Sequence, residues 1–357
     1  MAKLQKYFVQ FHETIKLDNL DENKTLREKR DIVLDKLSER LKMFFQDKSE
    51  STPTFDVFNQ GSYAMGTGIQ PVGGDYDIDV GLKFNISKED YPDPTEVKQW
   101  VYDALSTHTQ RVEFKRPCIT VFYQRHDEPI YHVDLAIYSE SSYDGSLYIA
   151  KGKPNSDERI WEASDPKQLI ELISNMFHDP EDGKQFRRII RYLKRWKDVH
   201  FSSDGNGAPI GIGITVAAYH WFNASKLVDI FTDKTTYDDL TAMQNFVNAV
   251  IGNFRDVYNA GEMISRLSVK LPVAPYCDLF EKMTDNHMIS FKRKLESLLS
   301  VLNEAQREPD PSEAGQKLQS QFGDNFPIPS KAEAAFVSSA PAIVSSSSSA
   351  WVSKCYN

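Results

Sequence analysis

The chain has 357 residues, with 51 aspartates and glutamates against 42 lysines and arginines and a formal net charge of −9. This acidic balance argues against broad nucleic-acid binding, which depends on neutralising phosphates with basic side chains. Three scattered cysteines exclude a disulfide framework and a zinc ribbon, and no apolar run suits a membrane span or a secretory signal. We therefore expect a cytoplasmic protein with no membrane partner, long enough for two lobes.

An apolar stripe among dense charges over residues 20–45 predicts a long amphipathic helix. The next informative segment spans residues 60–82. It places a turn at Gly61-Ser62 ahead of a strand in which Asp77 and Asp79 alternate with apolar residues. On a β-strand both carboxylates then project from one face while the apolar neighbours enter the core. Two carboxylates on one face suit Mg²⁺, a hard ion that takes oxygen ligands and substrate phosphates.

The simpler interpretation of this segment is a solvated acidic pair, because exposed aspartates are common. The context favours a functional site, since apolar residues flank the pair and a second glycine turn lies at Gly66-Thr67. A glycine lets the backbone approach a phosphate, and Ser62 at a helix N-terminus offers N–H groups, a hydroxyl and the positive end of the dipole. Asp75 follows two glycines and is expected to cap that turn.

A helix over residues 92–107 and strands over residues 118–124 and 130–138, separated by a polar turn, complete a mixed α/β unit. Asp134 lies in the otherwise apolar second strand. Burying a lone charge is costly, so Asp134 needs a cation or a metal as its partner unless it faces solvent on an edge strand. Asp134 is therefore the third candidate carboxylate.

From residue 165 onward the pattern is helical. Helices are predicted over residues 166–177, with Ser164 or Asp165 as the cap, and over residues 183–200, 214–222, 240–258, 287–305 and 311–322. The helix over 183–200 is basic on one face. Such a face is usually just exposed to solvent, but in an acidic chain a concentrated basic face more often has a local function. The glycine-rich residues 202–213 predict a flexible connection, and the Ala- and Ser-rich residues 330–357 predict a tail that is disordered when free.

These motifs resemble the polymerase-β-like nucleotidyltransferases and, within them, the CD-NTases, which are bacterial relatives of cyclic GMP-AMP synthase and oligoadenylate synthetase. The shared pattern is the Gly61-Ser62 turn, the Asp77-x-Asp79 strand and the later Asp134. The long N-terminal helix, the basic helix and the segment 326–329 also look like this group. The resemblance implies an α+β fold with three parts: a polymerase-β-like core with its spine helix in residues 1–163, a helical lobe in residues 164–329, and the tail.

The resemblance also implies roles for individual residues. Asp77, Asp79 and Asp134 would be the catalytic carboxylates and would bind two Mg²⁺ ions, for which Mn²⁺ can substitute. The residues expected to bind the nucleotide and its phosphates are Gln60, Gly61, Ser62, Lys194 and Arg191. Among these, Lys194 resembles the family's lysine that reaches the donor triphosphate.

The activity implied is the synthesis of a cyclic di- or trinucleotide from NTPs, ATP or GTP first, with release of pyrophosphate, in antiphage (CBASS) signalling. The resemblance further implies no obligatory long nucleic acid, and an operon-encoded regulator that binds or modifies the tail. Two alternatives stay open: a nucleotidyltransferase acting on RNA ends, against which the acidic charge counts, and an inactive scaffold, against which the three carboxylates count.

Overall fold

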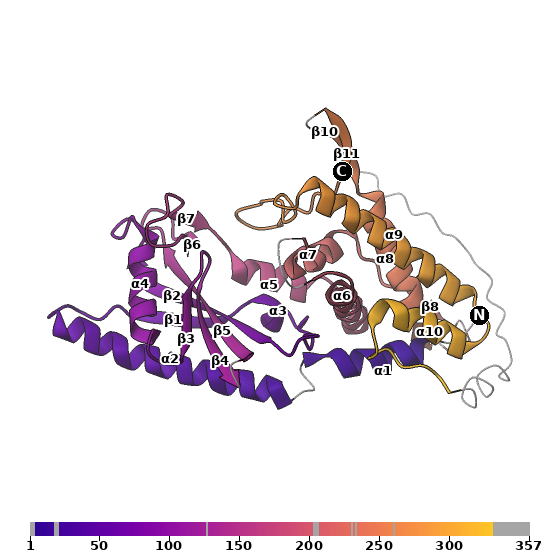
Figure 1. Ribbon diagram of the computed structural model, residues 1–357, viewed down its shortest axis with the longest axis horizontal. Helices are drawn as coiled ribbons and strands as arrows, with labels where there is room; N and C mark the ends of the chain where they lie inside the picture. The colour runs from indigo at the N-terminus through magenta and orange to yellow at the C-terminus, as the bar shows by residue number, and fades with distance from the viewer. Residues whose placement is uncertain are drawn as a thin grey trace.

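The structure is a computed structural model that describes residues 4–17, 21–125, 128–202, 207–229, 231–232, 234–259 and 261–330. It has two lobes, a sheet lobe and a helical lobe, each with its own apolar core (Figure 1). All but the first residue of the predicted tail over 330–357, and part of the predicted loop over 202–213, lie outside the described residues. No helix in the described ranges combines the length and apolar character that crossing a membrane requires.

The sheet lobe is built on one sheet of seven strands. β1, β2, β5, β4 and β3 are neighbours in that order, while β6 pairs with both β5 and β7. β2 and β5 are parallel, and their register sets Asp79 opposite Asp134. The bounds are β1 (Phe55–Asn59), β2 (Tyr76–Ser87), β3 (Arg111–Phe114), β4 (Ile119–Arg125), β5 (Glu128–Glu140), β6 (Leu147–Lys151) and β7 (Ile160–Ala163).

Helices α2 (Asp21–Asp47) and α4 (Pro94–Leu105) cover one face of this sheet (Figure 1). The apolar stripe of α2 and the alternate residues Ile78, Val80 and Leu82 of β2 are buried in the same cluster. Because side chains alternate along a strand, Asp77 and Asp79 must lie on the opposite face. The predicted alternation is confirmed, and it turns the carboxylates toward the helical lobe.

The helical lobe also contains the start of the chain, because α1 (Gln5–Ile15) packs into its core. Phe8 contacts Phe322 and Phe326 there, with ring centroids 6.3 and 5.2 Å apart. The other helices are α5 (Pro166–Ser174), α6 (Pro180–His200), α7 (Gly211–Trp221), α8 (Asp239–Gly252), α9 (Asp285–Arg307) and α10 (Pro311–Phe322). Two small hairpins join β8 (Lys226–Val228) to β9 (Thr235–Tyr237) and β10 (Arg255–Asn259) to β11 (Glu262–Arg266).

Most predicted elements are present with shifted ends, and Asp165 is the cap of α5, since its side chain accepts from the Gln168 amide. The prediction of one helix over residues 240–258 was wrong. α8 ends at Gly252, and the following residues pair with β11 as a hairpin that projects from the lobe (Figure 1). The predicted boundary at residue 163 stays a prediction, although α1 packs with the other lobe.

Candidate active site

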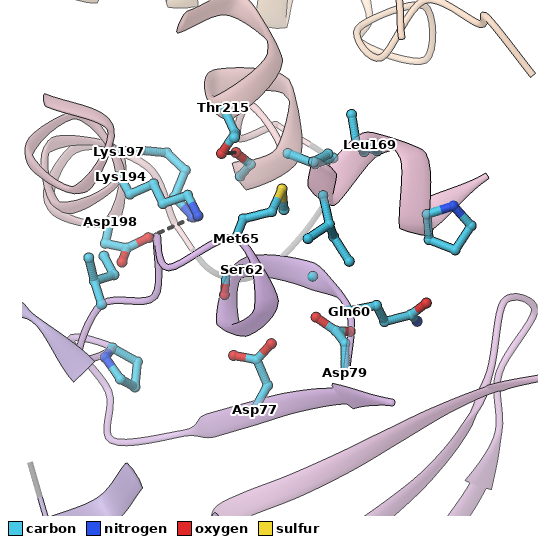
Figure 2. A pocket seen from close by; sticks show the side chains of 17 residues that line it. Gln60, Ser62, Met65, Asp77, Asp79, Leu169, Lys194, Lys197, Asp198 and Thr215 are labelled. Carbon is cyan, nitrogen blue, oxygen red and sulfur yellow. Dashed lines mark hydrogen bonds and ion pairs between the residues drawn. The ribbon is translucent and has the colours of Figure 1, made fainter. Parts of the chain in front are cut away.

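A pocket of about 500 Å³ lies where the two lobes meet, on the open face of the sheet (Figure 2). The sheet lobe contributes β2 and the short helix α3 (Gly61–Ala64), and the helical lobe contributes α5, α6 and α7. Six residues predicted from the sequence line it together: Gln60, Gly61, Ser62, Asp77, Asp79 and Lys194.

The two carboxylates of β2 point toward the turn that begins α3 (Figure 2). Gly61 has a φ of +64°, and a Cβ at this position would lie 1.9 Å from Asp79 Oδ2. A side chain of any other residue type would therefore collide with the carboxylate as well as strain the backbone. Glycine is needed here because the turn approaches Asp79 so closely.

The charges of this pair are poorly compensated. Desolvation, followed by the negative charges of Asp77 and Asp134, raises the pKa of Asp79 to about 7. Desolvation also raises the pKa of Asp77, where the charge of Asp134 adds to the effect and His132 and Lys194 oppose it. Asp77 is accessible from the pocket, but protein atoms around both side chains displace much of their hydration.

Asp134 reaches the same sheet face from β5 but is not among the residues that line the pocket. Its Oδ1 accepts a hydrogen bond from the fully buried Thr120 hydroxyl at 2.6 Å. Its Oδ2 lies 3.9 Å from Nε2 of His132. The other nitrogen of that ring lies 3.2 Å from Asp75, which thus contacts β5 and does not line the pocket.

The Asp77 and Asp79 carboxylates fit a divalent cation. Within the described ranges, neither has an ion-pair partner or accepts a hydrogen bond from another residue, so their oxygens are available as the hard ligands that Mg²⁺ takes. No three histidine, cysteine or carboxylate side chains of the described residues converge into a ready-made metal site. The role of Asp134 as a third ligand of the metal therefore stays a prediction.

The turn before α3 is bound to both central strands. The amide of Gln60 donates to the Asp79 carbonyl at 3.1 Å, and the Tyr138 hydroxyl on β5 donates to Gln60 Oε1 at 2.7 Å. The amide of Thr67 donates to the Ser62 carbonyl at 2.9 Å and so fixes the residues that follow α3 against Ser62. These bonds hold Ser62 above the carboxylates, as Figure 2 shows.

Lys194 enters the pocket from α6, on the wall opposite the carboxylates (Figure 2). It is buried, and its Nζ donates to the Thr67 carbonyl and hydroxyl at 3.1 and 3.2 Å. Desolvation lowers the pKa of Lys194 to about 8, an effect that Asp77 partly opposes. Arg191, one turn earlier, does not line the pocket, and its guanidinium donates to the carbonyls of Gly66 and Gly68.

The sequence did not single out several other residues of the pocket. Lys197 and Asp198 form an ion pair of 2.6 Å in its wall. Thr215 also lines it, and its hydroxyl donates to the Gly211 carbonyl at 3.2 Å. An apolar side comes from Met65, Ile69, Leu169, Ile170 and Ile212. A sequence pattern offers no signal for this side, because these residues come from segments that only the fold brings together.

Known proteins resemble this chain in part of its sequence and in its fold. Residues 55–138 match the family model described as cyclic GMP-AMP synthase DncV-like, nucleotidyltransferase domain. A protein of Escherichia albertii named cyclic GMP-AMP synthase is 30% identical over 155 residues, which are 41% of this chain. That match spans only 32% of the relative's length.

Crystal structures of Vibrio cholerae DncV share the fold over nearly the whole chain. The apo form superposes with a TM-score of 0.67 at 18% identity, covering 91% of this chain and 96% of that one. The form in complex with nonhydrolyzable GTP has a TM-score of 0.66 at 17% identity, covering 92% and 97%. The fold is thus α+β, a polymerase-β-like core joined to a helical lobe. The chain therefore contains a DncV-like nucleotidyltransferase domain over residues 55–138, within a fold that it shares with DncV over nearly its whole length.

Proposed function

We propose that this protein is a metal-dependent nucleotidyltransferase that joins NTPs into a cyclic di- or trinucleotide, releases pyrophosphate and serves antiphage signalling. One observation carries the proposal. Asp77 and Asp79, whose charges are poorly compensated, lie beside the Gly61-Ser62 turn on one side of the pocket, and Lys194 lies on the other side. A triphosphate carries the negative charge that Lys194 attracts, and carboxylates suit the cation that accompanies such a substrate.

In the reaction, a ribose hydroxyl attacks the α-phosphorus of the donor NTP, loses its proton, and displaces pyrophosphate. Ser62 and Lys194 would hold the phosphates that become pyrophosphate, and their hydrogen bonds would strengthen as charge accumulates on it. Asp77 and Asp79, with Asp134 as the predicted third ligand, would hold Mg²⁺, which supplies neutralising charge and lowers the pKa of the attacking hydroxyl. The same displacement within the linear product closes the ring.

The names of the relatives support cyclisation and suggest the bases. The Escherichia albertii relative is a cyclic GMP-AMP synthase, and DncV has been crystallised with nonhydrolyzable GTP and with the linear intermediate 5′ pppA(3′,5′)pG. ATP and GTP are therefore the first substrates to test. The regulator predicted to bind or modify residues 330–357 remains a prediction.

The test is to incubate the protein with the four labelled NTPs and Mg²⁺ or Mn²⁺ and then to treat the products with phosphatase. A small phosphatase-resistant product is expected. Asp77→Asn with Asp79→Asn should lower its formation at least about 10³-fold, because the charge that holds the metal is lost. The same variant should keep its circular-dichroism spectrum. Product that appears only with added RNA, or full activity of the double variant, would contradict the proposal.

A further inference from the structure

Three basic residues of α6 contact one short segment that follows α3. Residues 66–70, here called the coupling segment, follow α3 and lie against α6. Arg191, Lys194 and Arg195 lie three and four positions apart, so they share a face of α6. All three are buried, with exposed fractions of 4, 7 and 4%.

Each of these cations donates to the backbone of the coupling segment. Arg191 donates to the Gly66 carbonyl at 2.6 Å and to the Gly68 carbonyl at 3.1 Å. Lys194 donates to the Thr67 carbonyl and hydroxyl, and Arg195 donates to the Gln70 carbonyl at 2.6 Å. Hydrogen bonds from charged donors are the strong ones, and burial protects them from competition with water.

The coupling segment is in turn fixed to the phosphate-binding turn. The Thr67 amide donates to the Ser62 carbonyl, and the Gly66 amide donates to the Tyr63 carbonyl at 3.2 Å. A bond of 2.8 Å from the Gln70 amide to the Ile15 carbonyl ties its far end to α1. A continuous path of hydrogen bonds therefore runs from α6 through Thr67 to Ser62.

We propose that the coupling segment positions Ser62 and Lys194 against each other across the lobe boundary, with Arg191, Arg195 and Thr67 as positioning residues that do not touch the substrate. The inference rests on the proposed function, because it assigns the two positioned groups to the donor phosphates. It gives Arg191 a structural partner in place of the predicted phosphate contact. Because these bonds join groups of the protein itself, they would hold both phosphate-binding groups in position for the NTP, which lowers the cost of binding.

Two perturbing variants test this coupling. Arg191→Met removes both bonds to the coupling segment, and Thr67→Val removes only the hydroxyl that accepts from Lys194. Thr67→Ser restores that hydroxyl and is the conservative rescue. Arg40→Met is the matched control, because Arg40 donates to the Ala104 carbonyl at 2.9 Å and so joins two helices of the sheet lobe. Amide hydrogen exchange of residues 61–70 and steady-state kinetics with NTP are measured for each variant.

We expect Arg191→Met and Thr67→Val to speed amide exchange in residues 61–70 and to raise KM for NTP while kcat changes little. A lost charged hydrogen bond corresponds to about tenfold or more in KM for Arg191→Met. Thr67→Ser should restore both values, and Arg40→Met should leave both unchanged. Unchanged exchange or KM in both perturbing variants, or an equal effect of Arg40→Met, would overturn the coupling.

The exchange measurement does not need catalysis. A wild-type protein that forms no nucleotide product would contradict the proposed function, and the exchange data would then decide the coupling without kinetics. If Arg191→Met does not fold, Thr67→Val decides the outcome, because it is isosteric and removes a single acceptor.

Discussion

At the residue scale, Gly61 sets how closely the turn before α3 approaches the carboxylates. Any Cβ at this position would overlap Asp79, and the left-handed backbone adds strain. The residue thus links a local turn conformation to the geometry of the pocket.

Gly61→Ala should lower kcat/KM about 100-fold, because displacements near 1 Å at a reacting centre have effects of this size. Steady-state kinetics of NTP turnover measure it. Gly73→Ala is the matched control, since a Cβ at Gly73 would meet nothing within 4 Å. Equal losses in the two variants would show that the effect is not due to the contact between Gly61 and Asp79.

The proposed contact between Lys194 and the donor phosphates would make the affinity for NTP depend on pH. Burial lowers its pKa to about 8, so the free protein loses the ammonium charge as pH rises through that value. A triphosphate binds the charged form, and we therefore expect kcat/KM for NTP to fall between about pH 8 and 9.5.

Lys194→Arg retains its charge over this range, because the guanidinium pKa lies above about 12. At pH 7 its kcat/KM should be lower than the wild-type value. Between about pH 8 and 9.5, where the wild-type kcat/KM falls, that of the variant should stay nearly constant. The two pH profiles are compared at saturating Mg²⁺. A decline of equal steepness in both proteins would exclude Lys194 as the titrating group.

At the element scale, α6 uses its cations in three ways. Lys194 faces the pocket, Arg191 and Arg195 bind the coupling segment, and Arg188 donates to Asp239 at 2.7 and 2.8 Å. Asp239 is fully buried and also accepts from the Tyr192 hydroxyl at 3.1 Å. Arg191, Lys194 and Arg195 are buried and Arg188 is only partly exposed, so this part of the basic face is not simply solvated.

Removing one partner of the Arg188–Asp239 pair should destabilise the protein strongly. Arg188→Met leaves a buried carboxylate without its cation, which costs about 3–5 kcal/mol. Urea unfolding measures the loss. Lys184→Met on the same helix is the control, because its pair with Glu181 is exposed and such pairs contribute about 0–1 kcal/mol. A loss below that of the control would rule out a stabilising role for the buried pair.

At the scale of the whole molecule, the first and last described helices meet. α1 packs beside α10 in the helical lobe (Figure 1). The rings of Phe8 and Phe11 contact those of Phe322 and Phe326 there. The lobe that follows the sheet in sequence is thus completed by residues that precede it.

Phe326→Ala should lower the free energy of unfolding by about 3–5 kcal/mol, because it opens a cavity among these rings. Ile328→Ala is the comparison two residues away, where the side chain is 40% exposed and the loss should be much smaller. Thermal or urea unfolding distinguishes them. Similar losses would show that Phe326 does not hold α1 and α10 in one core.

Long periodic segments were predictable and short paired ones were not. The stripe over residues 20–45 predicts α2 because its own spacing defines the buried face. The hairpin β10–β11 was missed because each strand is stabilised by the other, and residues 255–258 extend an apparent helical pattern. α1 was missed as well, although the spacing of its buried residues Tyr7, Phe8, Phe11 and Ile15 is itself helical.

The sequence by itself determined the alternation of Asp77 and Asp79 with core residues, the glycine turn before them and the family pattern, because strand periodicity and backbone freedom are local properties. Only the tertiary structure decided which residues meet across the lobes. It placed Lys194 in the pocket, turned Arg191 toward the coupling segment and left Asp134 outside the pocket lining. The physical reason is that these contacts join segments more than 50 residues apart, and chain packing sets their geometry.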